Sequence, residues 1–287
     1  MSKVQYNNGS GFVTKYTYEY DGAGRLRQMY DSATGTRTTY SYDTAGRLLK
    51  SYNYKSGKIL NATSYTYDAK SRVTSMVYSL DYIYDDDADA YAWTNTYTYD
   101  ENTDLLSEMN ISMSSLTATL TYSYDGLNML DSKTAAFFHN GNAAFYNRVS
   151  YQYSSSRTSN VYKYKSETGR SSTGTLSTTE YNFTYDENGN ITQITDANGV
   201  IQNKYYYDNL GQLIREDNRA KNKTYVWTYD NAGNRTSEKT YAFSTSTLGT
   251  VSSTKNYSYS NSAWGDLLTF DGRNYMTYDA IGNSMRM

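Results

Sequence analysis

The chain has 287 residues and a formal net charge of −2, so it carries neither a basic footprint for nucleic acid nor a polybasic membrane patch. It contains no cysteine, which excludes disulfides and thiolate metal sites, and no proline, which would interrupt a sheet ladder. The 36 tyrosines and 3 tryptophans must supply much of the apolar contact area. Tyrosine combines an apolar ring with a polar hydroxyl, and therefore predicts a thin, sheet-like core whose hydroxyls reach water or polar groups at its margins.

A unit of the form Y-x-Y-D-x-x-G-[R/N/Q]-[L/I] recurs along the chain and is clearest in YEYDGAGRL, YSYDTAGRL, FTYDENGNI and YYYDNLGQL. Its second tyrosine recurs at Tyr20, Tyr42, Tyr67, Tyr99, Tyr124, Tyr153, Tyr185, Tyr207, Tyr229, Tyr259 and Tyr278. The shortest steps fit two strands and two short turns, and we expect longer steps to be longer loops on the far side of the hairpin.

The first clear unit shows what each motif position predicts. Tyr18 and Tyr20 are two residues apart and point to the same face of a strand, which ends at Asp21. Asp-x-x-Gly is typical of a type I turn whose glycine, Gly24, adopts the left-handed conformation of a G1 bulge. This register places Tyr20 opposite Leu26, with rings on one face of the sheet and charge on the other.

The same alignment assigns two sets of structural positions. The predicted turn residues are Asp21, Gly24, Asp43, Gly46, Asp68, Asp186, Gly189, Asp208, Gly211, Asp230, Gly233, Asp279 and Gly282. The predicted packing residues are Tyr18, Tyr20, Leu26, Tyr40, Tyr42, Leu48, Tyr185, Ile191, Tyr207 and Leu213.

The segments between clear units carry few other signals. Asp85, Asp86, Asp87 and Asp89 resemble the start of a calcium loop, but Ala90 and Thr96 occupy its glycine and glutamate positions. A solvated loop is the favoured interpretation, with weak cation binding as the alternative. The Ser/Thr-rich stretches 154–179 and 244–254 are expected to be polar loops or frayed hairpins.

The sequence predicts an all-β fold of tandem antiparallel hairpins that form a long curved or spiralling sheet. No composition shift, helical apolar period or linker divides the chain, so we expect residues 1–287 to form one array of about eleven units. We expect no separate catalytic or toxin domain.

No feature of the sequence favours an enzyme, a cofactor site or a metal site. The single histidine, His139, cannot supply a Cys-His pair or an ordinary zinc ligand set, and is expected to be a loop or structural residue. The nucleophile elbow, the P-loop and the dinucleotide fingerprint are all absent. Turn formation already accounts for the repeated aspartates that could otherwise indicate glycoside hydrolysis.

The segments YDGAGRL, YDTAGRL, YDENGNI and YDNAGNR, with the closing stretch WGDLLTFDGRNYMTYDAIGN, resemble the YD repeats of Rhs-family proteins. Relatives include bacterial polymorphic toxins, wall-associated proteins, Tc toxin shells and teneurins. The resemblance implies a β-sheet that winds into a hollow shell and, in the toxins, encloses a C-terminal effector. The family's self-cleavage motif contains Asp-Pro, which a proline-free chain lacks, and the chain is expected to be a fragment of such a shell.

The resemblance also implies the partners and the location of the protein. The expected partners are flanking repeats and an enclosed effector polypeptide, and the sheet edges could mediate self-association. Family resemblance implies a secreted or cell-surface protein, although the chain shows no export signal and no membrane span. The alternative function is a cell-surface carbohydrate-binding or adhesion module, because aromatic side chains can stack on sugars.

Overall fold

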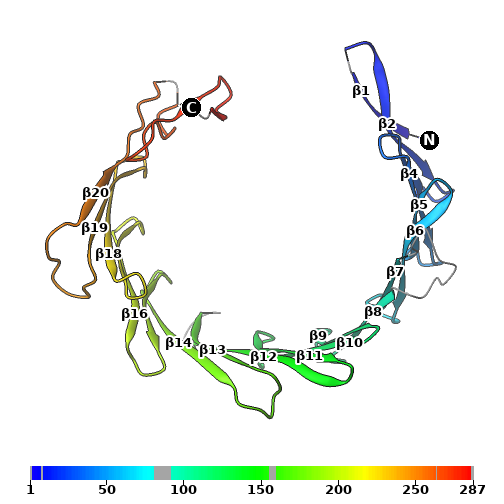
Figure 1. The fold of residues 1–287 in the computed structure, drawn as a ribbon, viewed down its shortest axis with the longest axis horizontal. Coiled ribbons are helices and arrows are strands. Elements are labelled where there is room, and N and C mark those ends of the chain that lie inside the picture. Colours follow the sequence, from blue (N-terminus) through cyan, green and yellow to red (C-terminus); the bar gives the residue numbers. More distant parts are fainter. Residues whose placement is uncertain (1, 8, 81–91, 155–159, 263, 286–287) are drawn as a thin grey trace. The chain divides into compact units, whose positions relative to one another are not determined.

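The computed structural model describes residues 2–7, 9–80, 92–154, 160–262 and 264–285. The acidic run Asp85, Asp86, Asp87 and Asp89 therefore lies outside the described residues. The described residues contain strands and turns but no helix, and twenty strands belong to one antiparallel sheet. This confirms the predicted all-β fold of tandem hairpins (Figure 1).

The strands in the first part of the chain are β1 (Ser2–Asn7), β2 (Phe12–Tyr20), β3 (Leu26–Asp31), β4 (Thr36–Tyr42), β5 (Leu48–Lys55), β6 (Lys58–Tyr67), β7 (Val73–Leu80), β8 (Ala92–Tyr99), β9 (Leu106–Met113), β10 (Leu116–Tyr124), β11 (Leu130–His139) and β12 (Asn142–Tyr153). The remaining strands are β13 (Val161–Gly169), β14 (Ser177–Tyr185), β15 (Ile191–Asp196), β16 (Ile201–Tyr207), β17 (Leu213–Asn218), β18 (Lys223–Tyr229), β19 (Arg235–Ala242), β20 (Ser253–Asn256), β21 (Thr277–Tyr278) and β22 (Ser284–Met285).

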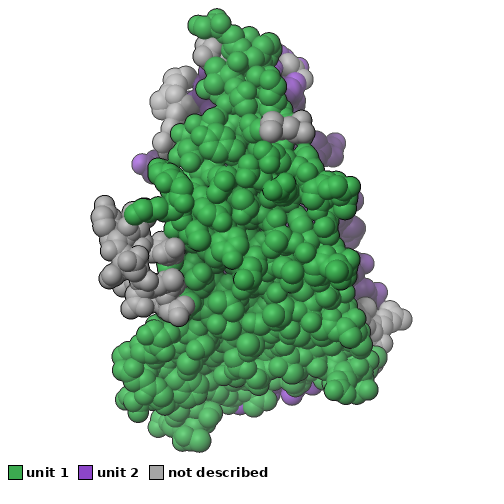
Figure 2. Space-filling view, turned by 90° about the vertical axis from the view of Figure 1, so that its right-hand side faces the viewer, with its two compact units in different colours: residues 1–150, 166–178 green, residues 151–165, 179–287 purple. Residues whose placement is uncertain are grey.

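The chain divides into two compact units, which are coloured separately in Figure 2. Unit 1 comprises residues 1–150 and 166–178, and unit 2 comprises residues 151–165 and 179–287. In unit 1, strands β1 to β12 pair antiparallel with their neighbours in sequence. In unit 2, strands β14 to β20 do the same. A single array across all 287 residues stays a prediction.

The second tyrosine of the motif marks where strands end. Ten of the eleven predicted positions are the last residue of an even-numbered strand from β2 to β18 or of β21. Tyr259 alone lies outside the named strands. The ladder register shifts directly before most of these tyrosines: Glu19 faces Gln28, whereas Tyr20 faces Leu26. Arg27 is left unpaired and forms a second bulge, beyond the G1 bulge that the motif predicts at Gly24. Bulges of this kind increase the local twist.

Longer steps between motifs are not always longer loops. The step from Tyr124 to Tyr153 contains β11 and β12, strands of 10 and 12 residues joined by a two-residue turn. For this step the expectation of a lengthened loop is wrong, because added residues that pair across a hairpin satisfy their backbone groups. The Ser/Thr-rich stretch 154–179 likewise contains β13, where the Tyr164 ring lies 5.9 Å from that of Tyr151 and 6.4 Å from that of Tyr181.

The hydrophobic core is thin. Figure 1 shows a single layer of strands in each unit, and most described residues in those strands are half-buried. Among the described hydrophobic residues, Ala118 alone is fully buried, at 4% exposure. Contacts between neighbouring hairpins must therefore supply much of the stabilisation that a second packed layer provides in a sandwich.

Candidate functional site: the ladder between repeats

The turn after β2 shows how the motif closes a hairpin. The Asp21 carbonyl accepts a hydrogen bond from the Gly24 N–H at 3.0 Å, and the Asp21 N–H donates to the Arg25 carbonyl at 2.9 Å. The Asp21 Oδ1 atom also accepts from the N–H groups of Ala23 and Arg25, both at 2.9 Å. Gly24 has φ of +78°, which glycine adopts without the steric cost of a Cβ atom.

The other predicted turn residues lie in equivalent turns. The Oδ1 atom of each further aspartate accepts a hydrogen bond from the N–H four residues on, at Asp43, Asp68, Asp186, Asp208, Asp230 and Asp279. The glycines have φ between +77° and +86°, at Gly46, Gly189, Gly211, Gly233 and Gly282. In the looser copies, Ser71 and Asn128 occupy this position with φ of 65° and 63°.

The residue after the turn glycine anchors the same aspartate a second time. The Arg25 Nε atom donates to Asp21 Oδ2 at 2.7 Å, and the Asn283 side-chain amide donates to Asp279 Oδ2 at 2.9 Å. The backbone N–H and guanidinium of Arg25 hold the pKa of the Asp21 carboxyl below its ordinary value. The side-chain amide and backbone N–H of Asn283 have the same effect on the pKa of Asp279. Arginine and asparagine recur here because both donate to a carboxylate.

The arginines also extend to the next repeat. The Arg25 guanidinium lies 4.7 Å from the centre of the Tyr42 ring and donates to the Asp43 carbonyl at 3.3 Å. Arg47 repeats this arrangement with Tyr67, at 4.7 Å, and with the Asp68 carbonyl, at 3.1 Å. The expected separation of rings and charge onto opposite faces is therefore wrong at these arginines, because a guanidinium is attracted to a tyrosine face.

A second contact between repeats comes from the motif tyrosines. Nine of the eleven second-tyrosine hydroxyls donate to the carbonyl of a residue in the preceding hairpin or segment, at 2.6–3.1 Å. The donor and acceptor pairs are Tyr42 and Leu26, Tyr67 and Leu48, Tyr99 and Val73, Tyr124 and Leu106, Tyr185 and Val161, Tyr207 and Ile191, Tyr229 and Leu213, Tyr259 and Arg235, and Tyr278 and Leu268. We call these nine bonds the inter-repeat ladder.

Burial accompanies these hydroxyl contacts. Desolvation by burial raises the pKa of the phenols of Tyr67, Tyr99, Tyr124, Tyr185, Tyr207, Tyr229 and Tyr259 above the ordinary value. A neutral phenol can donate to a carbonyl, whereas a phenolate cannot. The ladder therefore needs these tyrosines in their protonated form.

The predicted packing residues face one another as follows. Tyr20 lies opposite Leu26, Tyr42 opposite Leu48, Tyr185 opposite Ile191, and Tyr207 opposite Leu213. Tyr18 faces Met29 and Tyr40 faces Ser51. Their roles in packing stay predictions.

The described residues do not meet the requirements of a metal site. In the part of the chain that the structure describes, no group of three or more His, Cys, Asp or Glu residues could hold a metal ion. His139 ends β11, where it lies opposite Leu116 and Asn142. Within the same described ranges, no helix is long and apolar enough to cross a membrane.

The inter-repeat ladder was missed by sequence reasoning, although one signal for it was present. The strict recurrence of the second tyrosine, where its neighbours vary, indicates a contact beyond its own hairpin. A polar cluster in unit 2 had no sequence signal. There, Arg215 binds Asp217 through Nε at 2.7 Å, and also donates to the carbonyls of Ser244 and Ser246 at 2.7 and 3.0 Å.

The fold and the inter-repeat ladder together define an array of interlocked β-hairpin repeats. Residues 20–59 match the family model described as the RHS repeat, which confirms the resemblance to Rhs-type repeats. Among curated protein sequences, none is significantly similar to this chain.

Several solved structures resemble the chain. The crystal structure of TcdB2-TccC3-Cdc42 has 17% identity and a TM-score of 0.37, over 94% of this chain and 18% of that chain. The Photorhabdus luminescens Tc holotoxin pore with a TccC3 mutation has 18% identity and a TM-score of 0.39, over 94% and 17% of the two chains. A porin-like protein from Bacteroides uniformis has 13% identity and a TM-score of 0.29, over 78% and 92%. This chain thus spans less than a fifth of the two Tc toxin chains.

Proposed function

We propose that this chain is a wall segment of an Rhs-type secreted or cell-surface toxin protein, and that the wall encloses an effector polypeptide. The observation that carries the proposal is the inter-repeat ladder. Motif tyrosines and arginines contact backbone carbonyls of neighbouring repeats, as Tyr67 does with Leu48 and Arg47 with Asp68. The most regular side chains of the sequence thus hold a sheet together, which is the work of a scaffold.

The RHS repeat at residues 20–59 supports this proposal, because repeats of this type form shells in the toxins that the sequence resembles. Flanking repeats and the enclosed polypeptide are the proposed partners, and the scaffold needs neither a cofactor nor a catalytic residue. Self-association through a sheet edge is part of the proposal. Strand β1 supports it, since all six of its residues are exposed.

Protease protection tests the enclosed polypeptide. The complete reading frame is expressed, purified in its native state and digested with proteinase K, and the surviving peptides are identified by mass spectrometry. We expect a segment outside the repeats to survive in the native protein and to be digested once urea unfolds the repeats. Complete digestion of every non-repeat segment in the native protein contradicts enclosure.

A carbohydrate-binding or adhesion module is the second candidate, favoured by exposed rings such as Tyr162 at 43% and Tyr275 at 77% exposure. Exposed aromatic faces are suitable for stacking against sugar rings. A glycan array probed with the chain separates the two functions. A wall segment is expected to show no specific binding, whereas a specific signal in the micromolar range favours the adhesion module.

A further inference from the structure

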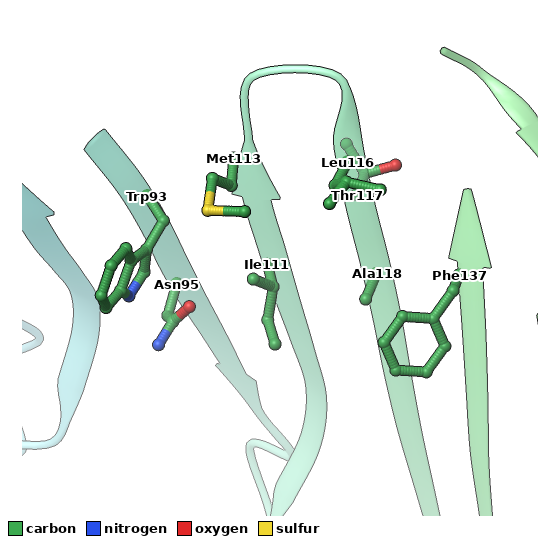
Figure 3. Close-up of a pocket in the computed structure, with 8 residues that line it drawn as sticks. All are labelled: Trp93, Asn95, Ile111, Met113, Leu116, Thr117, Ala118 and Phe137. Atoms are coloured by element: carbon green, nitrogen blue, oxygen red, sulfur yellow. The ribbon is translucent and has the colours of Figure 1, made fainter. Parts of the chain in front are cut away.

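An apolar groove crosses β8 to β11 in unit 1 (Figure 3). In the strand register each residue of one row lies opposite the next on the neighbouring strand. The row crosses four strands and consists of Asn95, Ile111, Ala118 and Phe137. The cavity volume is about 430 Å³, within the roughly 300–1,000 Å³ of small-molecule sites. We call this feature the β8–β11 groove.

A second row completes the groove beside the first. Trp93 lies opposite Met113, which in turn lies opposite Leu116. Figure 3 shows the indole of Trp93 next to the side chain of Asn95, on neighbouring positions of the same strand face. The walls are therefore almost entirely hydrocarbon and aromatic ring, with the amide of Asn95 among them.

The amide of Asn95 has an unsatisfied hydrogen-bond acceptor. Asn95 is buried, at 8% exposure, and its Oδ1 atom has no hydrogen-bond partner among the described residues. Its Nδ2 atom donates to the Tyr97 hydroxyl at 3.4 Å. A buried acceptor without a donor is costly, and such a group indicates a missing partner. The Oδ1 atom is itself buried, so the weakly held amide must turn toward the groove before a ligand donor reaches it. A ligand with an N–H or O–H donor on an apolar body suits this groove.

The apolar surface extends beyond the groove itself. Met113, Leu116 and Phe137 are 39%, 47% and 43% exposed. The Phe137 ring is 5.8 Å from that of Phe145 on β12, and the Trp93 ring stacks at 4.2 Å on that of Tyr78 on β7. A contiguous apolar surface over six strands is typical of a surface that another polypeptide covers, and it exceeds what one small ring would bury.

We propose that the β8–β11 groove binds the indole ring of a tryptophan side chain from a polypeptide that lies across β7 to β12. Indole is an apolar ring whose N–H donates and does not accept, so it satisfies Asn95 Oδ1 and brings no acceptor of its own. A phenol or an amide would bury a further unpaired atom in the same hydrocarbon surroundings. The choice of a polypeptide as ligand rests on the proposed function, whereas the choice of an indole rests on the groove alone.

Calorimetric titration of the 287-residue chain tests this assignment. The probes are N-acetyl-tryptophanamide, its 1-methylindole analogue, a short peptide with one central tryptophan, and the same peptide with phenylalanine in its place. We expect the tryptophan peptide to bind more tightly than the free amide, because flanking side chains cover the rim. Blocking the indole N–H is expected to weaken binding about three- to tenfold, the effect of losing one hydrogen bond.

Two variants assign the effect to the groove. Asn95→Leu removes the acceptor and should abolish the difference between indole and 1-methylindole. The matched control is Ser112→Leu, which adds the same side chain at an exposed position on the opposite face of β9 and should bind as the unaltered chain does. Circular dichroism checks that both variants fold. If Asn95→Leu does not fold, the comparison of indole with 1-methylindole on the unaltered chain remains decisive.

Three results would overturn the assignment. If neither N-acetyl-tryptophanamide nor the tryptophan peptide binds, the groove is not an indole site. If indole and 1-methylindole bind equally, Asn95 has no role in binding. Free amide binding as tightly as the peptide makes the groove a small-molecule site. Protease protection of an enclosed segment does not depend on these titrations. The proposed function can therefore hold when the groove does not bind indole, and the groove can bind indole when no segment is enclosed.

Discussion

Tyr67 ends β6, yet its hydroxyl bonds to the hairpin before it, because it donates to the Leu48 carbonyl at 2.7 Å. Tyr67→Phe keeps the ring and removes the donor, so the Leu48 carbonyl loses its partner. We expect a loss of about 1 kcal/mol in the free energy of unfolding, measured by urea denaturation. The control is Tyr20→Phe, at a tyrosine that is 48% exposed, where the change should be within about 0.5 kcal/mol. Equal effects of the two substitutions contradict the ladder.

The turn glycines permit a paired test of backbone strain. Gly46 has φ of +85°, and a Cβ atom added there would meet only Arg25 Nη1, at 3.7 Å, so the cost of Gly46→Ala is conformational. We expect this change to lower the free energy of unfolding by about 1–2 kcal/mol. Ser71 holds the equivalent position with φ of 65°, and Ser71→Gly should instead stabilise the chain in thermal unfolding. Shifts of the same sign for both changes would contradict the turn assignment.

The tyrosines of the ladder make stability sensitive to alkali. The folded-state pKa of Tyr67 and Tyr229 is raised by burial above the ordinary value of 10.0. Their contribution to stability is therefore fully present below pH 10.0 and is lost as the pH rises through the folded-state pKa. We expect the urea midpoint to fall as the pH rises above about 10, while absorbance at the phenolate band reports ionisation. A midpoint that stays constant while the phenols ionise would refute this linkage.

At the scale of single elements, the loop between β19 and β20 is held by a buried ion pair. Asp217 is fully buried, at 0% exposure, and accepts hydrogen bonds from Arg215 at 2.7 Å and from the Thr224 hydroxyl at 2.9 Å. Ser244, at the start of the loop, accepts from both Arg215 and Thr224. One ion pair thus joins strands β17 and β18 to a Ser/Thr-rich segment.

Replacing Arg215 should loosen that loop. Arg215→Met leaves the Asp217 carboxylate buried without its cation, and we expect a loss of about 3–5 kcal/mol together with faster proteolysis within residues 243–252. Arg37→Met is the control, since Arg37 lies on the Tyr54 ring at 4.4 Å in an exposed position. Adding Asp217→Leu to Arg215→Met should recover much of the loss. No recovery, or an equal loss in the control, would contradict a buried ion pair as the anchor.

Hairpins could be predicted from the sequence because their determinants are local. The Asp-x-x-Gly turn sets which residues face one another, so Tyr20 lies opposite Leu26, as Tyr42 lies opposite Leu48. Strand length was less predictable. The spacing between motifs shows how many residues a step adds but not whether they pair, and in β11 and β12 the added residues pair across the hairpin.

For the whole molecule, contacts between hairpins escaped prediction. The bond from Tyr67 to Leu48 ends on a backbone carbonyl, which any residue would present, so no side-chain pattern marks the acceptor. The groove was missed for a related reason. Trp93 and Asn95 belong to one strand, but Ala118 and Phe137 join them only through the order of strands in the sheet.

The two compact units should respond separately to local damage. Tyr67→Phe lies in unit 1 and Tyr229→Phe in unit 2, and each removes one bond of the ladder. In a repeat array, stability is a sum of local and nearest-neighbour contributions. We expect each change to speed amide hydrogen exchange in its own unit only, and the two losses to add within about 0.5 kcal/mol. Faster exchange in both units after a single substitution would show longer-range cooperativity.

The turns lie along two margins of the sheet. On the margin beside the ladder most turns have one length, and on the other margin the connections vary in length. Most described motif turns, such as Asp21 to Arg25 and Asp230 to Asn234, have the same length, whereas described connections on the opposite margin vary, as the pair 56–57 and residues 243–252 show. Because ladder bonds lie beside the motif turns, insertions at positions such as Asn140 and Gly141 leave every donor and acceptor in place. That margin is where foreign loops or epitopes can be grafted, and where such an array can diversify by gaining residues while its hairpins stay in phase.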